Sequence, residues 1–160
     1  MNPLLQSVQL ALQSVEQEEA LKQVDKAVKF CIKHENGKVF DGWDEDLIRL
    51  MVAYHWAKKT LIVHKNEDKT IRGVFMWYNC DKSDGWNFVN NWEPDKEDGD
   101  SIFMAFLFAD GKDSFKELTK DFINKCPEAL TKNKIGLRYR NGFPKRILYT
   151  NKLFKKIINQ

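Results

Sequence analysis

Two short stretches of this sequence combine residue types that could do chemistry. The first is Ala109–Ser114 (ADGKDS), where an apolar run ends and a helical pattern begins. A strand-to-helix junction presents unpaired backbone N–H groups at the positive end of the helix dipole, and such groups bind phosphates and oxyanions. Lys112 favours an anionic ligand there, whereas Asp110 and Asp113 disfavour one. An ordinary strand-to-helix turn would use the same residues, so both interpretations stay open.

The second stretch is Arg138–Arg146 (RYRNGFPKR), in which basic residues alternate with aromatic ones. Such a pattern can contact phosphates and stack on bases. The candidate contacts for an anionic partner, either a nucleic acid or an acidic protein, are Arg138, Arg140, Lys145 and Arg146. Alternation along a strand pair would place Arg138 and Arg140 on one face and Tyr139 on the other. A half-buried hairpin with a basic outer face is the alternative.

The distribution of charge also favours an anionic partner. Residues 129–160 carry nine basic side chains and no acidic one, whereas the preceding 128 residues carry 17 basic and 23 acidic side chains. A basic end beside an acidic body suggests a nucleic acid, a phosphorylated ligand or an acidic protein. A solvated basic face would have the same composition.

Several other kinds of site find little support. His34, His55 and His64 are isolated in the sequence, and the three cysteines show no metal-binding spacing. The cysteines are expected to be free thiols in a reducing compartment. No signal peptide and no apolar run of about 18 residues is found, so we expect no membrane segment. We expect a cytoplasmic protein, or a virion-associated one if a phage encodes it.

The chemistry-bearing stretches must be positioned by a series of helices and strands. Apolar spacing predicts a helix or helical pair within residues 1–36 and another helix from Asp44. Runs rich in β-branched and aromatic residues at 60–65 and 70–79 predict an antiparallel hairpin. The remaining predicted elements are a short strand at Trp86–Trp92, a central strand at Ser101–Ala109, a helix with the capping box Ser114–Glu117, paired strands at Lys134–Arg140 and Phe143–Thr150, and a terminal helix at Asn151–Ile158.

This order of elements predicts one mixed α/β (α+β) domain at residues 37–160, with a central sheet flanked by helices. Residues 1–36 form an N-terminal helical extension. Its first part carries Leu4, Val8, Leu12 and Val15 at helical spacing. Because nothing in the sequence explains an exposed apolar stripe there, we expect this extension to bind a partner protein or a second copy of the chain.

The order of elements and several short motifs resemble those of the GNAT-type N-acyltransferases, and most nearly their branch of toxin-activating lysine acyltransferases. The motifs are Trp92, Gly99-Asp100, the strand Ile102–Phe108, the turn Ala109–Gly111 and Arg140–Gly142. Over residues 40–157, the resemblance implies a GNAT-like fold. It also implies transfer of an acyl group from acyl-CoA or an acyl-carrier protein to an amine.

The resemblance further implies where a site would lie. Gly111, Lys112 and Ser114 would lie beside the thioester. The branch is expected to use a histidine before its second helix and an aspartate within the central strand, where this sequence has Phe40 and Ala105. His55, Asp110 and Tyr149 are the candidate replacements in catalysis.

Three functions therefore stay open: a GNAT-like acyltransferase, a non-catalytic structural or interaction protein with the same fold, and a small nucleic-acid-binding module. The abundance of Lys, Asn, Ile and Phe would suit an AT-rich bacterial or phage genome. A phage virion-associated protein is one form that the second alternative could take. A splayed pair of strands beside Phe108–Gly111 would favour the first.

Overall fold

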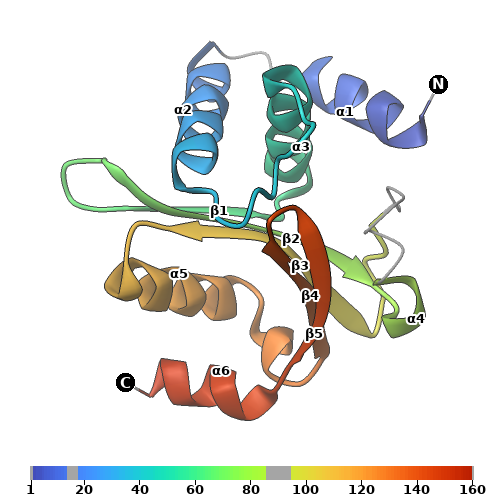
Figure 1. Cartoon of the computed structure of the whole chain (residues 1–160), viewed down its shortest axis with the longest axis vertical. Helices are drawn as coiled ribbons and strands as arrows, with labels where there is room; N and C mark the ends of the chain where they lie inside the picture. Colours follow the sequence, from blue (N-terminus) through green and yellow to red (C-terminus); the bar gives the residue numbers. More distant parts are fainter. Residues whose placement is uncertain (1, 14–17, 86–94, 160) are drawn as a thin grey trace.

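A computed structural model describes residues 2–13, 18–85 and 95–159 of the chain. A mixed sheet has helices on both of its faces (Figure 1), which confirms the predicted α+β architecture. One face carries α1 (Pro3–Gln13), α2 (Glu18–His34) and α3 (Glu45–Lys58). The other face carries α5 (Lys112–Lys125) and α6 (Asn151–Ile158). The short elements are α4 (Lys82–Gly85) and a 3-10 turn, Pro127–Leu130.

The five strands lie in the sheet in the order in which they occur along the chain. They are β1 (Leu61–Lys65), β2 (Ile71–Cys80), β3 (Ser101–Ala109), β4 (Asn133–Arg140) and β5 (Phe143–Tyr149). Neighbouring strands are antiparallel except for β3 and β4, which are parallel and are joined by the crossover that contains α5. The predicted strand at Trp86–Trp92 lies outside the described residues.

Local sequence signals explain most of these boundaries. The carboxylate Oδ1 of Asp44 accepts a hydrogen bond of 2.7 Å from the Leu47 N–H and so caps α3, which begins one residue after the predicted start at Asp44. Lys59 then ends α3 in the left-handed conformation. Asn141 and Gly142 both have positive φ, as a two-residue hairpin turn between β4 and β5 requires. α1 and α2 run in different directions, so the N-terminal pattern is a pair of helices (Figure 1).

The helices of the first face pack closely on the rest of the chain. Leu4 and Val8 of α1 are buried beside Tyr54 and Tyr78. α2 contributes its own apolar residues to a core that it shares with α3 and β2; these include Val24, Val28 and Cys31. The predicted N-terminal extension 1–36 therefore supplies side chains to the core of the domain.

The opposite face has a second core, centred on aromatic residues. Phe122 of α5 makes edge-to-face contacts with Phe75 and Trp77 of β2, with ring centroids 4.6 and 5.0 Å apart. Lys134 of β4 is fully buried below them, and its ammonium group donates hydrogen bonds to the carbonyl oxygens of Ala129 (2.5 Å) and Lys132 (2.9 Å). This buried lysine also bonds to the Asn151 side chain at the start of α6, and so fixes α6 to the sheet.

All three cysteines are buried free thiols, as the sequence predicts. Burial raises the pKa of both Cys31 and Cys126 to about 12, so neither is poised for reaction as a thiolate. No group of three potential metal-ligating side chains occurs in the described part of the chain. The described helices are all too short or too polar to cross a bilayer.

Candidate functional site

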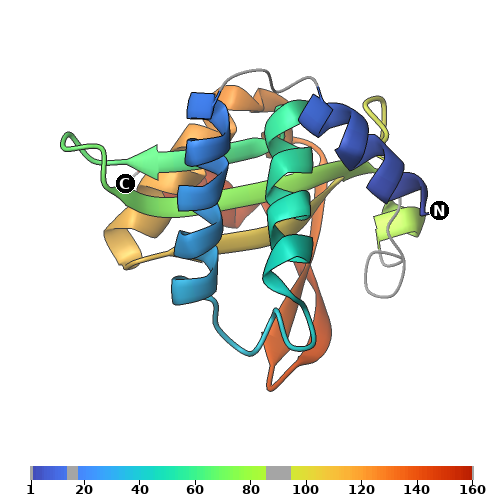
Figure 2. The ribbon, with the colours of Figure 1, turned by 90° about the horizontal axis from the view of Figure 1, so that it is seen from above.

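The parallel strands β3 and β4 pair along only part of their length. Ser101–Met104 of β3 lie opposite Asn133–Gly136 of β4, and the pairing stops there. β3 continues to Ala109 and β4 continues to Arg140. In Figure 2 the β4–β5 hairpin turns away from the direction that β1, β2 and β3 share. The two parallel strands therefore diverge and leave an opening in the middle of the sheet.

A β-bulge at Ala105 marks the point where the strands diverge. In the pairing of β2 with β3, Met76 lies opposite Phe106 and Trp77 lies opposite Met104. Ala105 therefore has no Cα partner on β2, and the pairing with β4 has already ended at Met104. A bulge increases the local twist of a strand and releases backbone polar groups from the ladder. Ala105, which the resemblance aligns with a catalytic aspartate, therefore lies at the bulge.

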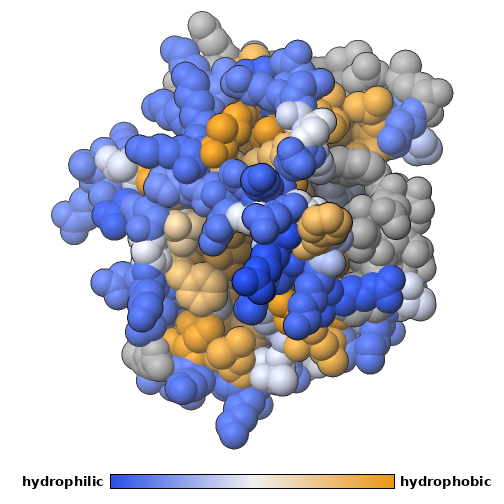
Figure 3. Space-filling view, viewed as in Figure 1, coloured by the Kyte–Doolittle hydropathy of each residue, from blue (hydrophilic) through white to orange (hydrophobic). Residues whose placement is uncertain are grey.

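The diverging strands enclose a cleft of about 490 Å³, which we call the β3–β4 cleft. One wall is Ala105–Ala109 of β3, and the other is Leu137–Tyr139 of β4. Residues from both helical layers line it, so the cleft reaches the two faces of the sheet. Figure 3 shows apolar side chains exposed next to strongly hydrophilic ones in this part of the molecule.

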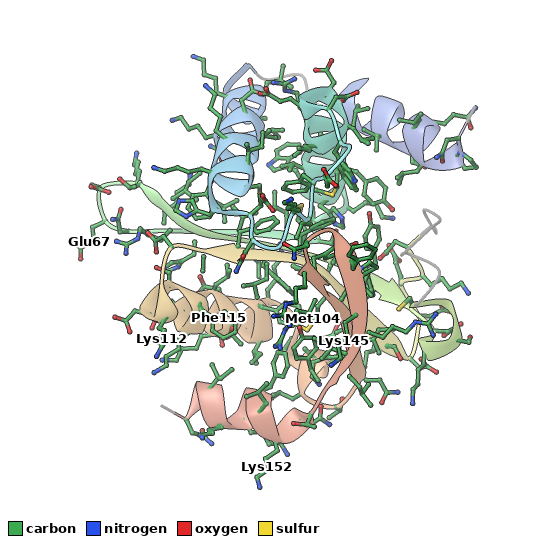
Figure 4. All side chains as sticks on the ribbon, in the orientation of Figure 1. Glu67, Met104, Lys112, Phe115, Lys145 and Lys152 are labelled. Atoms are coloured by element: carbon green, nitrogen blue, oxygen red, sulfur yellow. The ribbon has the colours of Figure 1, made fainter. Side chains whose placement is uncertain are left out.

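On the α5 side, the cleft is lined by Gly111, Lys112 and Phe115. Figure 4 shows Lys112 and Phe115 near the same end of α5. The N-cap residue of α5 is Gly111, which provides no side-chain hydrogen bond to the helix. The first N–H groups of α5 therefore have no side-chain cap, and they lie beside a lysine that lines the cleft. Arg138 reaches the same cleft from β4.

The predicted capping box Ser114–Glu117 is wrong, because α5 begins two residues earlier, at Lys112. The Ser114 hydroxyl does not cap the backbone, since it donates its hydrogen bond to the Asp110 carboxylate. Asp110 also forms an ion pair with Arg72 of β2. Ser114, followed by Arg72, holds the pKa of Asp110 below its ordinary value. Asp110 is therefore an ionised anchor between β2, β3 and α5, with its oxygens already engaged by other groups.

On the opposite side, the cleft is lined by His34, Asn36 and Val39. His34 ends α2, and its ring stacks on Phe30 with centroids 4.2 Å apart. Phe40 lies nearby and stacks on Phe106, the residue that follows the bulge, with centroids 5.6 Å apart. Phe40 thus contacts the residue next to Ala105 in the chain, and neither Phe40 nor Ala105 has a side chain that can carry a proton.

Two of the predicted catalytic residues lie away from this cleft. His55 of α3 is fully buried, and its Nδ1 lies 2.8 Å from the Thr60 hydroxyl. Burial lowers the pKa of His55 to about 3, so this imidazole is neutral across the physiological range. Tyr149 of β5 packs against Phe154 of α6 within the second core, where burial raises its pKa. Neither residue lines the β3–β4 cleft.

The predicted binding residues divide into two groups. Gly111, Lys112 and Arg138 line the cleft, and Ser114 lies just behind it against Asp110. The other basic candidates, Arg140, Lys145 and Arg146, lie on the β4–β5 hairpin beyond the cleft (Figure 4 labels Lys145).

Sequence reasoning missed His34 and Tyr139 as lining residues of a possible reaction site. His34 is a lone histidine near the end of a helix, and no motif surrounds it. In the sequence, Tyr139 is an aromatic residue between two arginines, and nothing there connects it with a reaction site. Both become candidates because the loop after α2 packs on the β4–β5 hairpin, where the Gly142 N–H donates to the Gly37 carbonyl at 2.8 Å. Comparisons of the chain with protein-family models, curated proteins and solved structures found no match.

Proposed function

We propose that this protein is a GNAT-like N-acyltransferase, which binds an acyl thioester in the β3–β4 cleft and transfers the acyl group to an amine. One observation carries the proposal: two neighbouring parallel strands diverge at a bulge and open a cleft of about 490 Å³ through the sheet. The resemblance of residues 40–157 to the GNAT-type enzymes implies a thioester site at this place in the fold.

The cleft offers suitable partners for the thioester donor. Beyond Met104, the edge of β3 that faces β4 is no longer paired, so an extended pantetheine chain can hydrogen-bond to it as an added strand would. The phosphate groups of acyl-CoA, or of the phosphopantetheine on an acyl-carrier protein, then lie towards the start of α5. Lys112 and Arg138 provide positive charge there, and the helix dipole adds to it.

The opposite mouth of the cleft offers a base for the acceptor amine. His34 accepts a proton from the incoming ammonium group, and the free amine then attacks the thioester carbonyl carbon. The C–N bond forms, the C–S bond breaks, and the sulfur leaves as a thiolate. Tyr139 can give a proton to that thiolate, because burial raises its pKa and keeps the phenol protonated at neutral pH. The new amide nitrogen releases its second proton, which restores the Tyr139 phenol.

The apolar residues at positions 40 and 105 limit the chemistry that the cleft can perform. With Phe40 and Ala105 in place of a histidine and an aspartate, most of the rate acceleration must come from positioning and from backbone N–H donors near the bulge. The same substitutions favour the alternative of a non-catalytic protein that still binds a thioester. Binding and turnover must therefore be measured separately.

Binding is tested by the melting temperature in the presence of acetyl-CoA and a longer acyl-CoA. A ligand at 100 times its Kd stabilises the native state by about 2.7 kcal/mol, which raises Tm by several degrees. Lys112→Glu should weaken binding about fivefold to tenfold, because a charge at a helix N-terminus contributes about 1 kcal/mol. Lys152→Glu is the matched control: it makes the same charge change on the exposed surface of α6, away from the cleft (Figure 4).

Turnover is tested by thiol release from acyl-CoA with an amine acceptor, in the wild type and in His34→Gln. The substitution should leave the ligand-induced rise in Tm unchanged and should slow thiol release about 10²-fold to 10⁴-fold, the usual contribution of a general base. A rise in Tm without thiol release in the wild type would favour the non-catalytic alternative. No rise with any acyl-CoA or with an acyl-carrier protein would sink the proposal, as would equal effects of Lys112→Glu and Lys152→Glu.

A further inference from the structure

One face of the β4–β5 hairpin carries cations and an exposed aromatic ring. The register of the hairpin places Arg138 opposite Lys145 and Arg140 opposite Phe143. Paired residues and alternate residues of a strand share a face, so these four side chains point the same way. All four are exposed, and Phe143 is 77% exposed at the end of the hairpin. We call this surface the basic hairpin face.

The loop between α2 and α3 contacts the hairpin at its turn and at Tyr139, on the other face, where Pro144 and Arg146 stay exposed. The Gly142 N–H donates a hydrogen bond of 2.8 Å to the Gly37 carbonyl. Gly37 packs so closely on the Tyr139 backbone that a Cβ at residue 37 would overlap the Tyr139 carbonyl oxygen. The loop therefore holds the β4 strand of the hairpin in place and leaves the basic hairpin face open.

Nothing in the described chain neutralises the basic hairpin face. Residues 129–160 contain no acidic side chain, and α5 packs on β1, β2 and β3 rather than on the hairpin. The carboxylate nearest the turn is Asp41, which approaches Gly142 from the loop that contacts the other face. Figure 3 shows the strongly hydrophilic side chains gathered over the hairpin.

We propose that the basic hairpin face binds single-stranded nucleic acid. Arg138 and Arg140 are two residues apart on a strand, which places them about 6.6 Å apart along it. Successive phosphates of an extended single strand can match that spacing, and Phe143 offers a ring on which a base can stack.

The test uses fluorescence anisotropy with a fluorescein-labelled oligo(dT) of about 16 nucleotides, a length that a single-strand site can fill. Binding should be saturable, and log K should fall linearly with log salt between about 50 and 200 mM. Arg140→Ala/Lys145→Ala should reduce that salt slope by about 1.4, because each single-strand phosphate contact contributes about 0.7. Arg138 is left intact, since it also lines the β3–β4 cleft.

Two further variants separate base stacking from charge. Phe143→Ala should weaken binding about tenfold without changing the salt slope, because stacking does not release counterions. Lys155→Ala/Lys156→Ala removes the same charge from exposed positions on α6 and should leave both affinity and slope unchanged. Melting curves identify any variant that fails to fold.

Four outcomes would overturn the proposal. They are the absence of saturable binding, an equal loss in the α6 double variant, no effect of Phe143→Ala, and competition by polyglutamate as strong as that by unlabelled oligo(dT). The last outcome would identify an acidic protein as the partner. The variants leave Arg138, which also lines the β3–β4 cleft, intact, so each of these results leaves the proposed acyltransferase activity to its own test.

Discussion

Burial and hydrogen bonding decide which individual side chains can react. His55 looks like a catalytic histidine in the sequence, yet it is enclosed between α3 and β2 and bonds to Thr60. Asp110 looks like a base beside a glycine turn, yet Ser114 and Arg72 occupy its carboxylate. His34 carries no motif, yet it lines the cleft. Residue type alone therefore does not show which histidine lines the cleft.

The buried His55 should make the protein less stable in mild acid. Its pKa is about 3 in the folded protein and about 6.5 in an unfolded chain, so only the unfolded state takes up a proton at intermediate pH. The stability is present above pH 6.5 and is lost as pH falls towards 3. Between pH 7 and pH 5 the free energy of unfolding should fall by about 2 kcal/mol from this group. Chemical denaturation at the two pH values measures it.

The control replaces both members of the buried pair, as His55→Phe/Thr60→Val. This double variant should lose about 2 kcal/mol less between pH 7 and pH 5 than the wild type does. His34 and His64 remain in both proteins, so the comparison isolates the contribution of His55. An identical pH dependence in the two proteins would show that His55 is not held neutral by burial.

Whether a residue lines the cleft can be predicted from the sequence only where the signal is local. Gly111 and Lys112 follow a long apolar strand, and a strand-to-helix junction of this kind has a known place at a sheet edge. Arg138 reaches the cleft because β4 is the parallel neighbour of β3. Tyr149 could not be placed without that topology, since its role as a core residue depends on α6 folding back over the sheet.

At the level of helices and strands, the sequence predicts which elements form better than it predicts their boundaries and register. The apolar run of residues 101–109 correctly predicts β3, and the turn residues Asn141-Gly142 correctly predict the β4–β5 hairpin. The start of α5 was misplaced, because Ser114 has the right type for a cap but bonds to Asp110. The bulge at Ala105 has no local signal, since it results from the register between β2 and β3. The cleft follows from that register, so the sequence could only suggest its place.

The loop between α2 and α3 must hold the hairpin in place for the cleft to keep its shape. Gly37→Ala should destabilise the protein in two ways: residue 37 has a φ of +76°, and a Cβ there would overlap the Tyr139 carbonyl oxygen. The left-handed conformation costs about 1 kcal/mol and the overlap about 1–3 kcal/mol more. Denaturant unfolding measures the sum.

Gly42→Ala provides a matched control within the same loop. Gly42 has a φ of +81°, but nothing lies within 4 Å of a Cβ at that position. This variant should therefore show the conformational cost alone, about 1 kcal/mol. Equal destabilisation by the two substitutions would mean that Gly37 does not pack tightly on the hairpin.

At the scale of the whole molecule, the sheet separates two helical layers and the cleft connects them. Lys112 and Arg138 give the α5 side a positive charge suited to phosphates, while His34 stands on the α2 side. A donor and an acceptor can thus enter from opposite faces and meet at the bulge of Ala105. The basic hairpin face lies beyond this cleft on the same hairpin, so one element of the fold contributes to both proposed sites.

The most direct test of the central claim is a titration of the ¹⁵N-labelled protein with acyl-CoA, followed by backbone amide NMR. If acyl-CoA binds in the β3–β4 cleft, the largest chemical-shift changes should fall on residues 105–109 of β3, on Lys112 and on residues 137–139 of β4. Amides of α6 and of the hairpin β1–β2 should change little. An absence of shifts at saturating acyl-CoA, or shifts confined to those distant elements, would contradict the account.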